Sequence, residues 1–595
     1  MSESTAKLLN NPYGEVTFDL FRHDERAFAD KTLFIKYLDD ESMSYYPILH
    51  RPRRFGKSTF VQMLKCYYDI SYKDRYEELF SGTKIYDENL STHNSYHVID
   101  FDFSRVNTEN YETLVDSFFS VMVLGIDDFK RRYPEFKFDY SKLNQKDSVT
   151  FFNYFTNAYL NHFNTKNLYV LIDEYDNFAN EILSKDLDLF LSITGQNGLL
   201  KSFYASIKAS TIGNGSIAKT FITGVSSVSL DSLTSGFNIA LNVTSFDCFN
   251  EYAGFTEDEL DILIPKLVDV AKLGVSTREI IERMKPVYDG YCFSAEADKT
   301  VYNSSMCLYY LDEVREKGVF LNPEDYLDPA CDQDGYKLEQ LFNLTQKETT
   351  EFIIDTYLQG GVFYLSKLSE NINLNQLKEY SREQLLSMLY YLGYLTIDSG
   401  KSSPSELALK IPNRFMSKLF ARCTIEFRYK DNTEFTEAPK LNLSALTACD
   451  DDISSFAQSC TEFLSRIMNN QVLSHMNEMA LNLALYAKLE TMAIVNTYVK
   501  MQQSVQVPKE GERFPDLVIT VNKGLADECI YLIELKYLTK TEARDKNSES
   551  TLKSAVKDAA AEIAAYKSAI DFKGKNVKAY AMIFAGPDCV YCQPH

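Results

Sequence analysis

The segment HRPRRFGKST, from His50 to Thr59, decides how the first part of this chain folds. It follows a short apolar run, Tyr45–Leu49, whose composition predicts a β-strand. It precedes FVQMLKCYYDI, Phe60–Ile70, whose apolar spacing predicts a helix. A strand, a Gly-Lys-Ser turn and a helix in this order are the setting of a phosphate-binding loop. The sequence therefore predicts a nucleotide site at this turn.

The residue types in the turn suit ATP with Mg²⁺. Backbone N–H groups of such a loop point at phosphates, and the helix N-terminus adds partial positive charge. We expect Lys57 to reach the β- and γ-phosphates and the Ser58 hydroxyl to hold Mg²⁺. Arg54, Gly56 and Thr59 complete the expected nucleotide contacts.

The entry of the loop departs from the general pattern G-x-x-x-x-G-K-[ST]. Arg51 stands where that pattern has its first glycine, and Pro52 follows it. The entry is therefore stiffer than in most phosphate loops. A chance Gly-Lys-Ser sequence is the alternative interpretation, and the predicted strand, the helix and a later acidic strand argue against it.

The acidic strand lies in NLYVLIDEYDNF, Asn167–Phe178. Its apolar run, Leu168–Ile172, is typical of a strand buried in a parallel sheet. We expect Asp173 to support the Mg²⁺ shell and Glu174 to polarise the attacking water. A strand that simply ends in surface acids is the alternative. Asp176 is a weaker candidate and is interpreted as a helix-start residue.

A further β-rich run, Lys219–Leu230, ends in small polar residues. Thr223 and Ser226 are candidate sensors of the γ-phosphate. The alternation of strands and helices up to this point predicts an α/β fold with a doubly wound parallel sheet, as in P-loop NTPases, of roughly 250 residues.

Two further elements are predicted in this region. The piece DKTLFIKYL, Asp30–Leu38, predicts a helix, and YHVIDFDFSRV, Tyr96–Val106, predicts a second strand. Asp100 and Asp102 lie on one face of that strand. Polar ends of a core strand explain this pair better than a functional site does.

After residue 254 the sequence becomes helical. Thr256 and Glu259 form a predicted capping box. A helix that runs into a strand, Ser381–Ile397, and a return strand, Leu407–Pro412, predict a winged-helix-like arrangement. A lid for the ATPase is favoured over a DNA-binding wing, because the hairpin tip GKSSPSE is nearly neutral.

A linker between domains is expected at Phe427–Asn442. The expected domains are a P-loop domain at 1–254, a lid at 255–430 and a small α/β domain at 431–595.

A second constellation lies in the last of these domains. Two predicted strands, Phe514–Val521 and Cys529–Leu538, carry Asp516 and the E-x-K pair Glu534 and Lys536. Residues two apart on a strand face the same side. Two carboxylates suit a hard cation such as Mg²⁺ or Mn²⁺. The lysine can orient a water or stabilise developing charge. Charged groups inside the apolar run YLIELKYL are costly unless they line a site.

Three further residues could border this cleft. Glu478, on a predicted helix upstream, is a candidate catalytic carboxylate. Glu562 and Tyr566 lie on a predicted helix downstream, Ala555–Ile570, and a solvated helix face is the favoured interpretation for Glu562. A final predicted strand, VKAYAMIFAG, closes the chain. This order of helix, strands, helix and strand predicts a small α/β domain, and the arrangement of Asp516, Glu534 and Lys536 within it is that of restriction-endonuclease-like PD-(D/E)XK nucleases.

Composition limits the functional classes. The chain has 595 residues, a formal net charge of −22 and no apolar run of the ~18 residues that a membrane span needs. A protein that coats nucleic acid nonspecifically is usually basic, so any nucleic-acid contact must be local. Eleven cysteines without regular spacing indicate free thiols in a reducing, cytoplasmic setting. The pair Cys589 and Cys592 with His595 is interpreted as free thiols rather than as a zinc site, which needs about four ligands.

The chain resembles a family that joins an AAA-ATPase-like domain to a C-terminal PD-(D/E)XK nuclease domain. The matching motifs are DKT at 30–32, RPRRFGKS at 51–58, LIDEYD at 171–176, FITGVS at 221–226, GFTEDE at 254–259, YDGYCFS at 288–294, LGYLTI at 392–397, KIPN at 410–413 and the PD…ELK set around Asp516 and Glu534. The chain departs from the family in having no Trp and in having Glu562 where many members have Gln.

The resemblance implies an ATP- and Mg²⁺-dependent nuclease in which Asp516 and Glu534 bind metal and Lys536 assists. DNA is favoured over RNA as substrate, and no membrane partner is expected. The sequence leaves open whether the protein forms a homo-oligomer. Two alternatives remain: a nucleotide-switched protein that binds nucleic acid or protein without cutting, and a signalling ATPase that oligomerises on a trigger.

Overall fold

The computed structural model describes residues 8–40, 42–141, 147–183, 186–195, 198–226, 237–321, 323, 326, 328–329, 332–358, 361–369, 381–429, 435, 437–468, 476–492, 497–503, 505–508, 510–522, 528–539, 542 and 548–595. The chain divides into two compact units. The N-terminal unit consists of Met1–Thr349 and Val362–Ser417, and the C-terminal unit of Thr350–Gly361 and Lys418–His595. The expected P-loop domain and most of the expected lid thus share one unit; the three-domain division stays a prediction.

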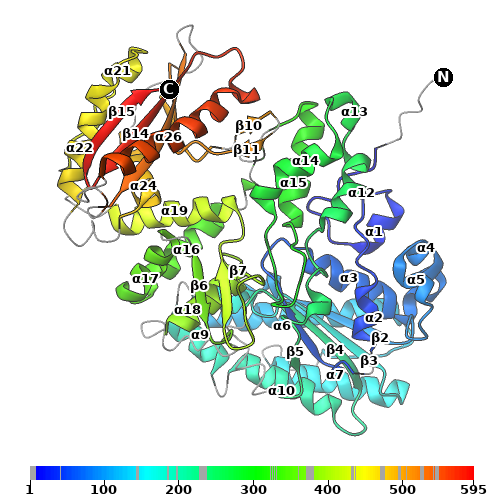
Figure 1. Cartoon of the computed structure of the whole chain (residues 1–595). Helices are drawn as coiled ribbons and strands as arrows, with labels where there is room; N and C mark the ends of the chain where they lie inside the picture. Colours follow the sequence, from blue (N-terminus) through cyan, green and yellow to red (C-terminus); the bar gives the residue numbers. More distant parts are fainter. Residues whose placement is uncertain are drawn as a thin grey trace, which may run out of the picture. The chain divides into compact units, whose positions relative to one another are not determined.

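The N-terminal unit is built on a parallel five-stranded sheet, which confirms the predicted α/β class (Figure 1). Its order is β2-β3-β4-β1-β5, and every neighbouring pair is parallel. The strands are β1 (Pro47–His50), β2 (His97–Asp102), β3 (Leu168–Asp173), β4 (Ile217–Gly224) and β5 (Leu241–Asn242). β1 and β3, which precede the two predicted motifs, therefore flank β4, and all three end at the same edge of the sheet.

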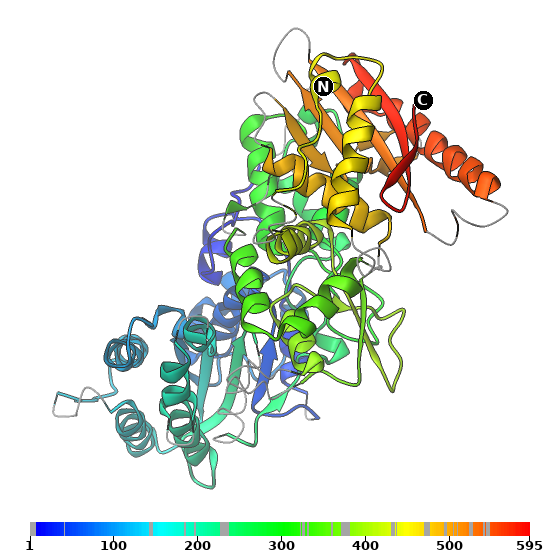
Figure 2. The same ribbon diagram turned by 90° about the vertical axis from the view of Figure 1, so that its left-hand side faces the viewer.

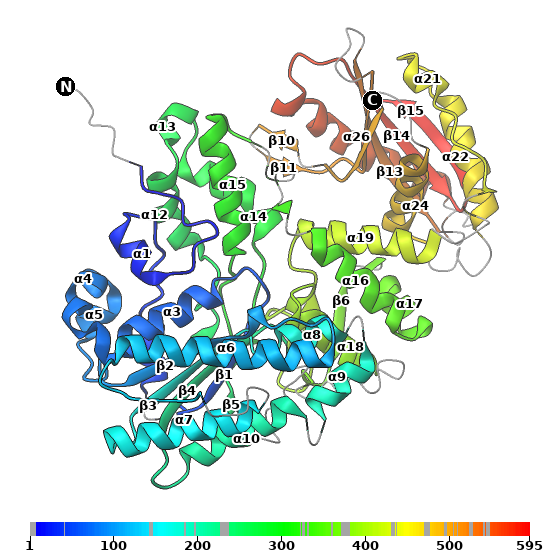
Figure 3. The same cartoon turned by 180° about the vertical axis from the view of Figure 1, so that it is seen from behind.

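Helices cover both faces of this sheet because successive strand residues point to opposite sides. Helix α3 (Lys57–Tyr68) packs on one face, where Phe60 meets Phe221 with ring centroids 5.7 Å apart. On the other face α7 (Ser148–Phe163) and α10 (Leu199–Thr211) meet Phe101 through Phe152 and Phe203. Helix α6 (Tyr111–Arg132) lies against β2 (Figure 3).

The remaining helices of the N-terminal unit are short or belong to its helical part. They are α1 (Phe18–His23), α2 (Phe34–Leu38), η1 (Ile70–Arg75), α4 (Tyr76–Phe80), α5 (Lys84–Glu88), η2 (Phe103–Arg105), α8 (Asn177–Leu183), α9 (Leu187–Thr194), η3 (Asp247–Phe249), α12 (Glu257–Leu267), α13 (Val270–Leu273), α14 (Thr277–Tyr288), α15 (Ser304–Lys317), α16 (Asp332–Leu344) and α18 (Arg382–Tyr391). The predicted capping box of Thr256 and Glu259 is present at the start of α12. Among the described residues, no helix is both long and apolar enough to cross a membrane.

Two predicted strands of this unit end earlier than expected. Strand β2 stops at Asp102, because the Asp102 side chain accepts a hydrogen bond from Ser104 N–H and starts the 3₁₀ turn η2. Strand β4 stops at Gly224, and residues 227–230 of the predicted run lie outside the described residues.

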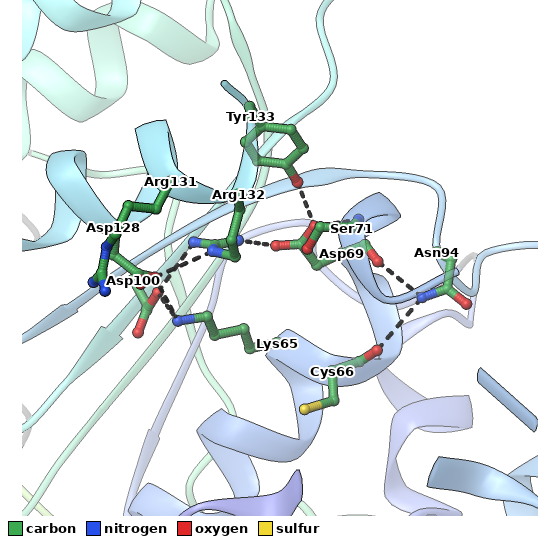
Figure 4. A network of polar contacts seen from close by, with 10 residues as sticks. All are labelled: Lys65, Cys66, Asp69, Ser71, Asn94, Asp100, Asp128, Arg131, Arg132 and Tyr133. Atoms are coloured by element: carbon green, nitrogen blue, oxygen red, sulfur yellow. Dashed lines mark hydrogen bonds and ion pairs between the residues drawn. The ribbon is translucent and has the colours of Figure 1, made fainter. Parts of the chain in front are cut away.

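A buried polar network joins α3, β2 and α6 (Figure 4). Lys65 Nζ lies 2.8 Å from Asp100 and 2.9 Å from Asp128. Arg132 pairs with Asp69, which is fully buried and also accepts from Tyr133. These ion pairs explain Asp100 as part of the core of the domain.

The helical part of this unit contains a small antiparallel sheet of order β6-β8-β7. Its strands are β6 (Val362–Leu365), β7 (Thr396–Ile397) and β8 (Leu407–Lys410). Strand β7 follows α18, as the predicted winged-helix-like pattern requires. Between them Gly393 has a φ of +86°, and a Cβ there would approach Pro52 Cβ to 2.7 Å. Pro52 of the phosphate loop is thus packed directly against this element, which only glycine permits.

The C-terminal unit contains a second five-stranded sheet, of order β15-β14-β13-β12-β9. The strands are β9 (Tyr498–Met501), β12 (Leu517–Val521), β13 (Cys529–Leu538), β14 (Val577–Ala585) and β15 (Asp588–Pro594), and β10 (Val505–Val507) pairs with β11 (Gly511–Arg513) separately. The sheet is mixed, because β13 and β14 are parallel and the other pairs antiparallel.

Helices lie on both faces of this sheet (Figure 2). The helices that lie wholly or partly in this unit are α17 (Lys347–Leu358), α19 (Arg414–Tyr429), α21 (Ser444–Thr447), α22 (Ser454–Ile467), α24 (Glu478–Thr491), α26 (Ser548–Lys567) and η7 (Ile570–Phe572), and α22, α24 and α26 contact the sheet. α26 packs Ile563 and Tyr566 over Leu532 and Ala581. The bounds of β13 match the prediction, whereas the prediction that the Val577 strand closes the chain is wrong: β15 follows and pairs with it.

The first residue of the phosphate loop, Arg51, is a buried cation that holds several segments together. Its side chain is 1% exposed. The guanidinium donates to the carbonyl oxygens of His50 and Thr244 at 2.7 and 2.8 Å and to that of Phe249 at 2.6 Å. Its central carbon lies 4.0 Å from the ring centroid of Phe293. Arg51 thus connects β1, the segment after β5 and the helical part of the unit.

We expect Arg51→Gly, which restores the general loop pattern, to destabilise the protein by about 3–5 kcal/mol, because it leaves buried carbonyl oxygens unpaired and opens a cavity. Urea unfolding of the purified protein measures this. Arg53→Ala is the matched control: Arg53 is a neighbouring arginine, part-buried, that donates to Asn177 Oδ1, and its loss should cost far less. An Arg51→Gly protein as stable as wild type would contradict the role assigned to Arg51.

Candidate functional site

The predicted phosphate loop joins β1 to α3. Gly56 has a φ of +89° and caps the helix, which begins at Lys57. A left-handed residue is needed at this turn, and glycine adopts it without strain. The loop is fixed from the helical side, since the Arg54 carbonyl accepts from Ser304 Oγ at 3.0 Å and Ser305 N–H at 3.2 Å. The first residues of α15 therefore contact the loop directly.

The structure brings the two predicted ATPase motifs together. Lys57 is buried, and its Nζ lies 3.1 Å from Glu174 Oε1 and 3.2 Å from the Pro52 carbonyl. Glu174 follows β3 with a φ of +51°, a backbone conformation that residues with a side chain seldom adopt. Such outliers cluster at functional sites. The candidate catalytic carboxylate is thus the counter-ion of the phosphate-loop lysine in this structure.

Asp173 meets the requirements of a metal ligand. Its side chain is 7% exposed, and within the described parts of the chain Oδ1 has no hydrogen-bond partner. Burial, with the neighbouring Glu174 carboxylate, raises the pKa of Asp173 to about 7, and a hydrogen bond from Ser58 opposes this shift. A buried, unpaired carboxylate oxygen beside a serine hydroxyl is a donor set that fits Mg²⁺.

The polar residues at the end of β4 have structural partners. Thr223 Oγ1 donates to the Leu49 carbonyl at 2.7 Å, which ties β4 to β1. Asp176 accepts from Val225 N–H at 3.0 Å and from both the N–H and the hydroxyl of Ser226. Asp176 therefore fixes the end of β4 besides preceding α8. A sensor role for Thr223 stays a prediction.

A cavity of about 240 Å³ lies beside the loop. It is lined by all the loop residues predicted to bind nucleotide, together with Glu174. Its lining also includes the apolar residues Phe21, Phe28, Leu263 and Leu308. A lining that combines charged and apolar groups suits a ligand with phosphates and a base.

His50, at the end of β1, connects the phosphate loop to the acidic strand. Tyr175 donates its hydroxyl to the Ser226 carbonyl, so His50 Nε2–H must be the donor in the 2.9 Å contact to Tyr175. His50 Nδ1 then accepts from Thr244 Oγ1 at 3.0 Å. Both ring nitrogens of the neutral imidazole are satisfied. Burial, with the nearby charges of Arg51 and Lys57, lowers the pKa of His50 to about 3.

The second constellation also assembles. Glu478 on α24, Asp516 just before β12 and Glu534 on β13 each offer an oxygen atom within 4.8 Å of the others. We call these three residues the carboxylate cluster. Asp516 Oδ2 accepts from Leu535 N–H at 2.8 Å. Glu534 is 2% exposed, and among the described residues its Oε2 has no hydrogen-bond partner. Three carboxylates with an orphaned buried oxygen fit a hard divalent cation.

Lys536 lies at the centre of this cluster. Its Nζ is 2.7 Å from Glu534 Oε1, 3.3 Å from Glu478 Oε1 and 3.7 Å from Glu562 Oε1. Glu562 also accepts from the buried Tyr566 hydroxyl at 3.0 Å. The structure therefore brings Tyr566 and Glu562 to the edge of the cluster, while the Glu562 side chain stays about half exposed on its helix, in line with the favoured interpretation of a solvated helix face.

Burial perturbs the pKa values of the cluster. It raises the pKa of Glu534 to about 9, and the Asp516 charge adds to this shift. Burial also raises the pKa of Asp516 to about 7. The pKa of Lys536 is raised by its carboxylate neighbours, although burial opposes this. Perturbed pKa values grouped in this way are typical of functional sites.

One residue of this site was not predicted from the sequence. Asn482, one helical turn after Glu478, donates from Nδ2 to Asp516 Oδ1 at 3.0 Å. Its spacing of four residues from Glu478 on a predicted helix is the signal that could have identified it. Cys589 and Cys592 lie on β15 as free thiols, and the carboxylate cluster is the metal-type grouping found in the described residues.

Residues 12–234 match the family model described as predicted AAA-ATPase. A curated relative, "Uncharacterized protein in vnfD 5'region" of Azotobacter chroococcum mcd 1, is 25% identical over 300 residues, which cover 49% of this chain and 50% of that protein. The chain thus matches about half the length of this relative. A solved Walker-type ATPase of Pyrococcus abyssi aligns with a TM-score of 0.39 and 14% identity, over 66% of this chain and 94% of that one. The family match by itself assigns an AAA-ATPase-like domain to residues 12–234. The family match ends before the C-terminal unit.

We expect His50→Gln to weaken the acid sensitivity of unfolding. In wild type, unfolded His50 binds a proton near pH 6.5 that the folded protein excludes down to about pH 3. The contribution of His50 to the free energy of unfolding is therefore fully present above pH 6.5. On acidification below that pH it falls by about 1.4 kcal/mol per pH unit.

Urea unfolding from pH 4.5 to 7.5 gives the free energy of unfolding as a function of pH. The slope of this dependence should be smaller in the variant than in wild type by that amount. His97, whose pKa burial lowers to about 4, acts in both proteins and cancels in the comparison. Equal slopes would contradict a buried neutral His50.

Proposed function

We propose that this protein hydrolyses ATP at the phosphate loop and, under the control of that nucleotide, cleaves phosphodiester bonds of nucleic acid at the carboxylate cluster. The AAA-ATPase-like domain supports the first activity. The observation that carries the second is the assembly of Glu478, Asp516 and Glu534 around one position with the Lys536 ammonium beside them.

At the phosphate loop, ATP competes with Glu174 for Lys57. Phosphate oxygens replace the carboxylate as the counter-ion of the ammonium, and Glu174 is released to accept a proton from the attacking water. Ser58 and Asp173 would hold Mg²⁺, which neutralises phosphate charge when bound. The residue that polarises water is therefore freed by the binding of substrate.

At the carboxylate cluster, Asp516 and Glu534 would hold Mg²⁺ or Mn²⁺, with Glu478 as a third carboxylate. A bound divalent cation lowers the pKa of a coordinated water and neutralises the charge of the scissile phosphate. Lys536 donates hydrogen bonds to the nucleophile or to the oxygens that gain charge. Glu562 and Tyr566 orient Lys536 from α26.

The substrate is a polyanion, while the chain carries a net charge of −22. Contacts must therefore be local and depend on Lys536 and the bound cation rather than on a wide basic surface. DNA is the favoured substrate over RNA in this proposal.

The contacts of Lys536 also favour a second candidate. An ammonium within 3.7 Å of three glutamates neutralises part of the cluster without any metal. The C-terminal unit would then be a non-cleaving module that holds nucleic acid or protein under nucleotide control. Cleavage assays separate the two candidates.

We expect two variants to separate the two activities. Lys57→Ala should lower ATP turnover at least ~100-fold, because the phosphates lose their cation. Glu534→Ala should abolish strand scission and leave ATP turnover intact. Phosphate release and a panel of labelled DNA and RNA, with Mg²⁺ or Mn²⁺ and with or without ATP, measure both.

Glu549→Ala is the matched control for Glu534→Ala, because Glu549 is an exposed glutamate of the same unit whose partner is Lys553. Wild-type protein that binds DNA or RNA but cuts neither under any of these conditions would reject the nuclease in favour of the second candidate.

A further inference from the structure

Asp516 belongs to no strand, and its side chain must be fixed by other means. It precedes β12 by one residue. One carboxylate oxygen, Oδ2, accepts from Leu535 N–H at 2.8 Å on β13. The other oxygen, Oδ1, accepts from Asn482 Nδ2 at 3.0 Å on α24. Two donors from different elements thus set the plane of this carboxylate.

Asn482 also holds the main chain of Asp516. The same Nδ2 lies 3.2 Å from the Asp516 carbonyl oxygen, which accepts from Gln502 N–H as well. Asn482 therefore controls both the position of the residue and the direction of its side chain. The Asp516 carbonyl oxygen can only accept a hydrogen bond and therefore determines the amide orientation, because the alternative would place Oδ1 of Asn482 against it.

The oxygen side of the Asn482 amide has no hydrogen-bond partner among the described residues. Asn482 is 1% exposed, and in the described parts of the chain its Oδ1 makes no hydrogen bond. A buried acceptor without a donor costs about 1–3 kcal/mol. A residue chosen only to tie α24 to β12 would not carry this cost, which points to a role at the cluster itself.

Asn482 and Glu478 share one face of α24, since four residues separate them. Glu478 supplies an oxygen to the cluster, and Asn482 fixes the residue that supplies a second one. Each oxygen of Asp516 keeps a lone pair after accepting one hydrogen bond, so the fixed carboxylate is still able to bind a cation.

We propose that Asn482 is a positioning residue of the carboxylate cluster, which holds Asp516 in the orientation that a divalent cation requires. This inference rests on the metal site of the proposed function. Outer residues that orient metal ligands typically change metal affinity by about 10–100-fold when they are replaced.

The test is the affinity of the full-length protein for Mn²⁺, measured by calorimetry at constant pH. Asn482→Leu keeps the side-chain size and removes the donor. Asn482→Ala is the second variant. Both should bind Mn²⁺ about 10–100-fold more weakly than wild type. The Mn²⁺-induced rise in unfolding temperature should shrink in parallel, and this measurement remains usable if a variant is destabilised.

Asn522→Ala is the matched control. Asn522 lies at the opposite end of β12 and donates to the Thr447 carbonyl. Its loss should lower the unfolding temperature without changing Mn²⁺ affinity.

The outcomes separate the two claims. Wild type and the Asn482 variants binding Mn²⁺ equally, with only stability reduced, would overturn the role of Asn482 and leave the proposed metal site standing. Wild type that binds neither Mn²⁺ nor Mg²⁺ would overturn both the inference and the proposed nuclease.

Discussion

The N-terminal unit depends on a buried cation, Arg51, which has no carboxylate partner among the described residues. Carbonyl oxygens from three residues and the face of Phe293 stabilise it instead. Burial lowers the pKa of this guanidinium, yet arginine keeps its proton in proteins. The charge must therefore be solvated by the dipoles of backbone peptide groups, and those groups must keep their positions. The phosphate loop, the segment after β5 and the helical part of the unit are ordered around that requirement.

The two candidate sites follow one electrostatic scheme. In each, an ammonium lies against a glutamate, Lys57 with Glu174 and Lys536 with Glu534. In each, a neighbouring buried carboxylate oxygen lacks a hydrogen bond among the described residues. Such an arrangement is poorly stabilised as it stands, because a buried acceptor is left unpaired. A ligand that brought positive charge to the carboxylates and, at the phosphate loop, negative charge to the lysine would satisfy these groups.

Sequence patterns predicted the parts that depend on local chemistry. β1, β3 and β13 were recognisable because apolar runs end in charged residues at characteristic spacing, and the structure brings Lys57 to Glu174 and Glu534 to Asp516. The pattern could not show that Arg51 is buried, since nothing local indicates which carbonyl groups will surround it. The sequence shows the hydroxyl of Thr223 but not its hydrogen-bond partner. That partner is the carbonyl of Leu49, which is distant in sequence. Asn482 was not predicted because its hydrogen-bond partner, Asp516, lies 34 residues away in the sequence. β15 was missed because DCVYCQP has no regular alternation.

Strand β15 has a consequence for the handling of this protein. It covers β14, whose buried residues include Met582, Ile583 and Phe584. The final residue takes part, since His595 N–H donates to the Ala579 carbonyl and Lys567 donates to the His595 carbonyl. A chain cut before Asp588 would expose β14 as a long apolar edge, which is the kind of surface that pairs with other chains and aggregates. β15 therefore shields the edge of β14 from pairing with other chains.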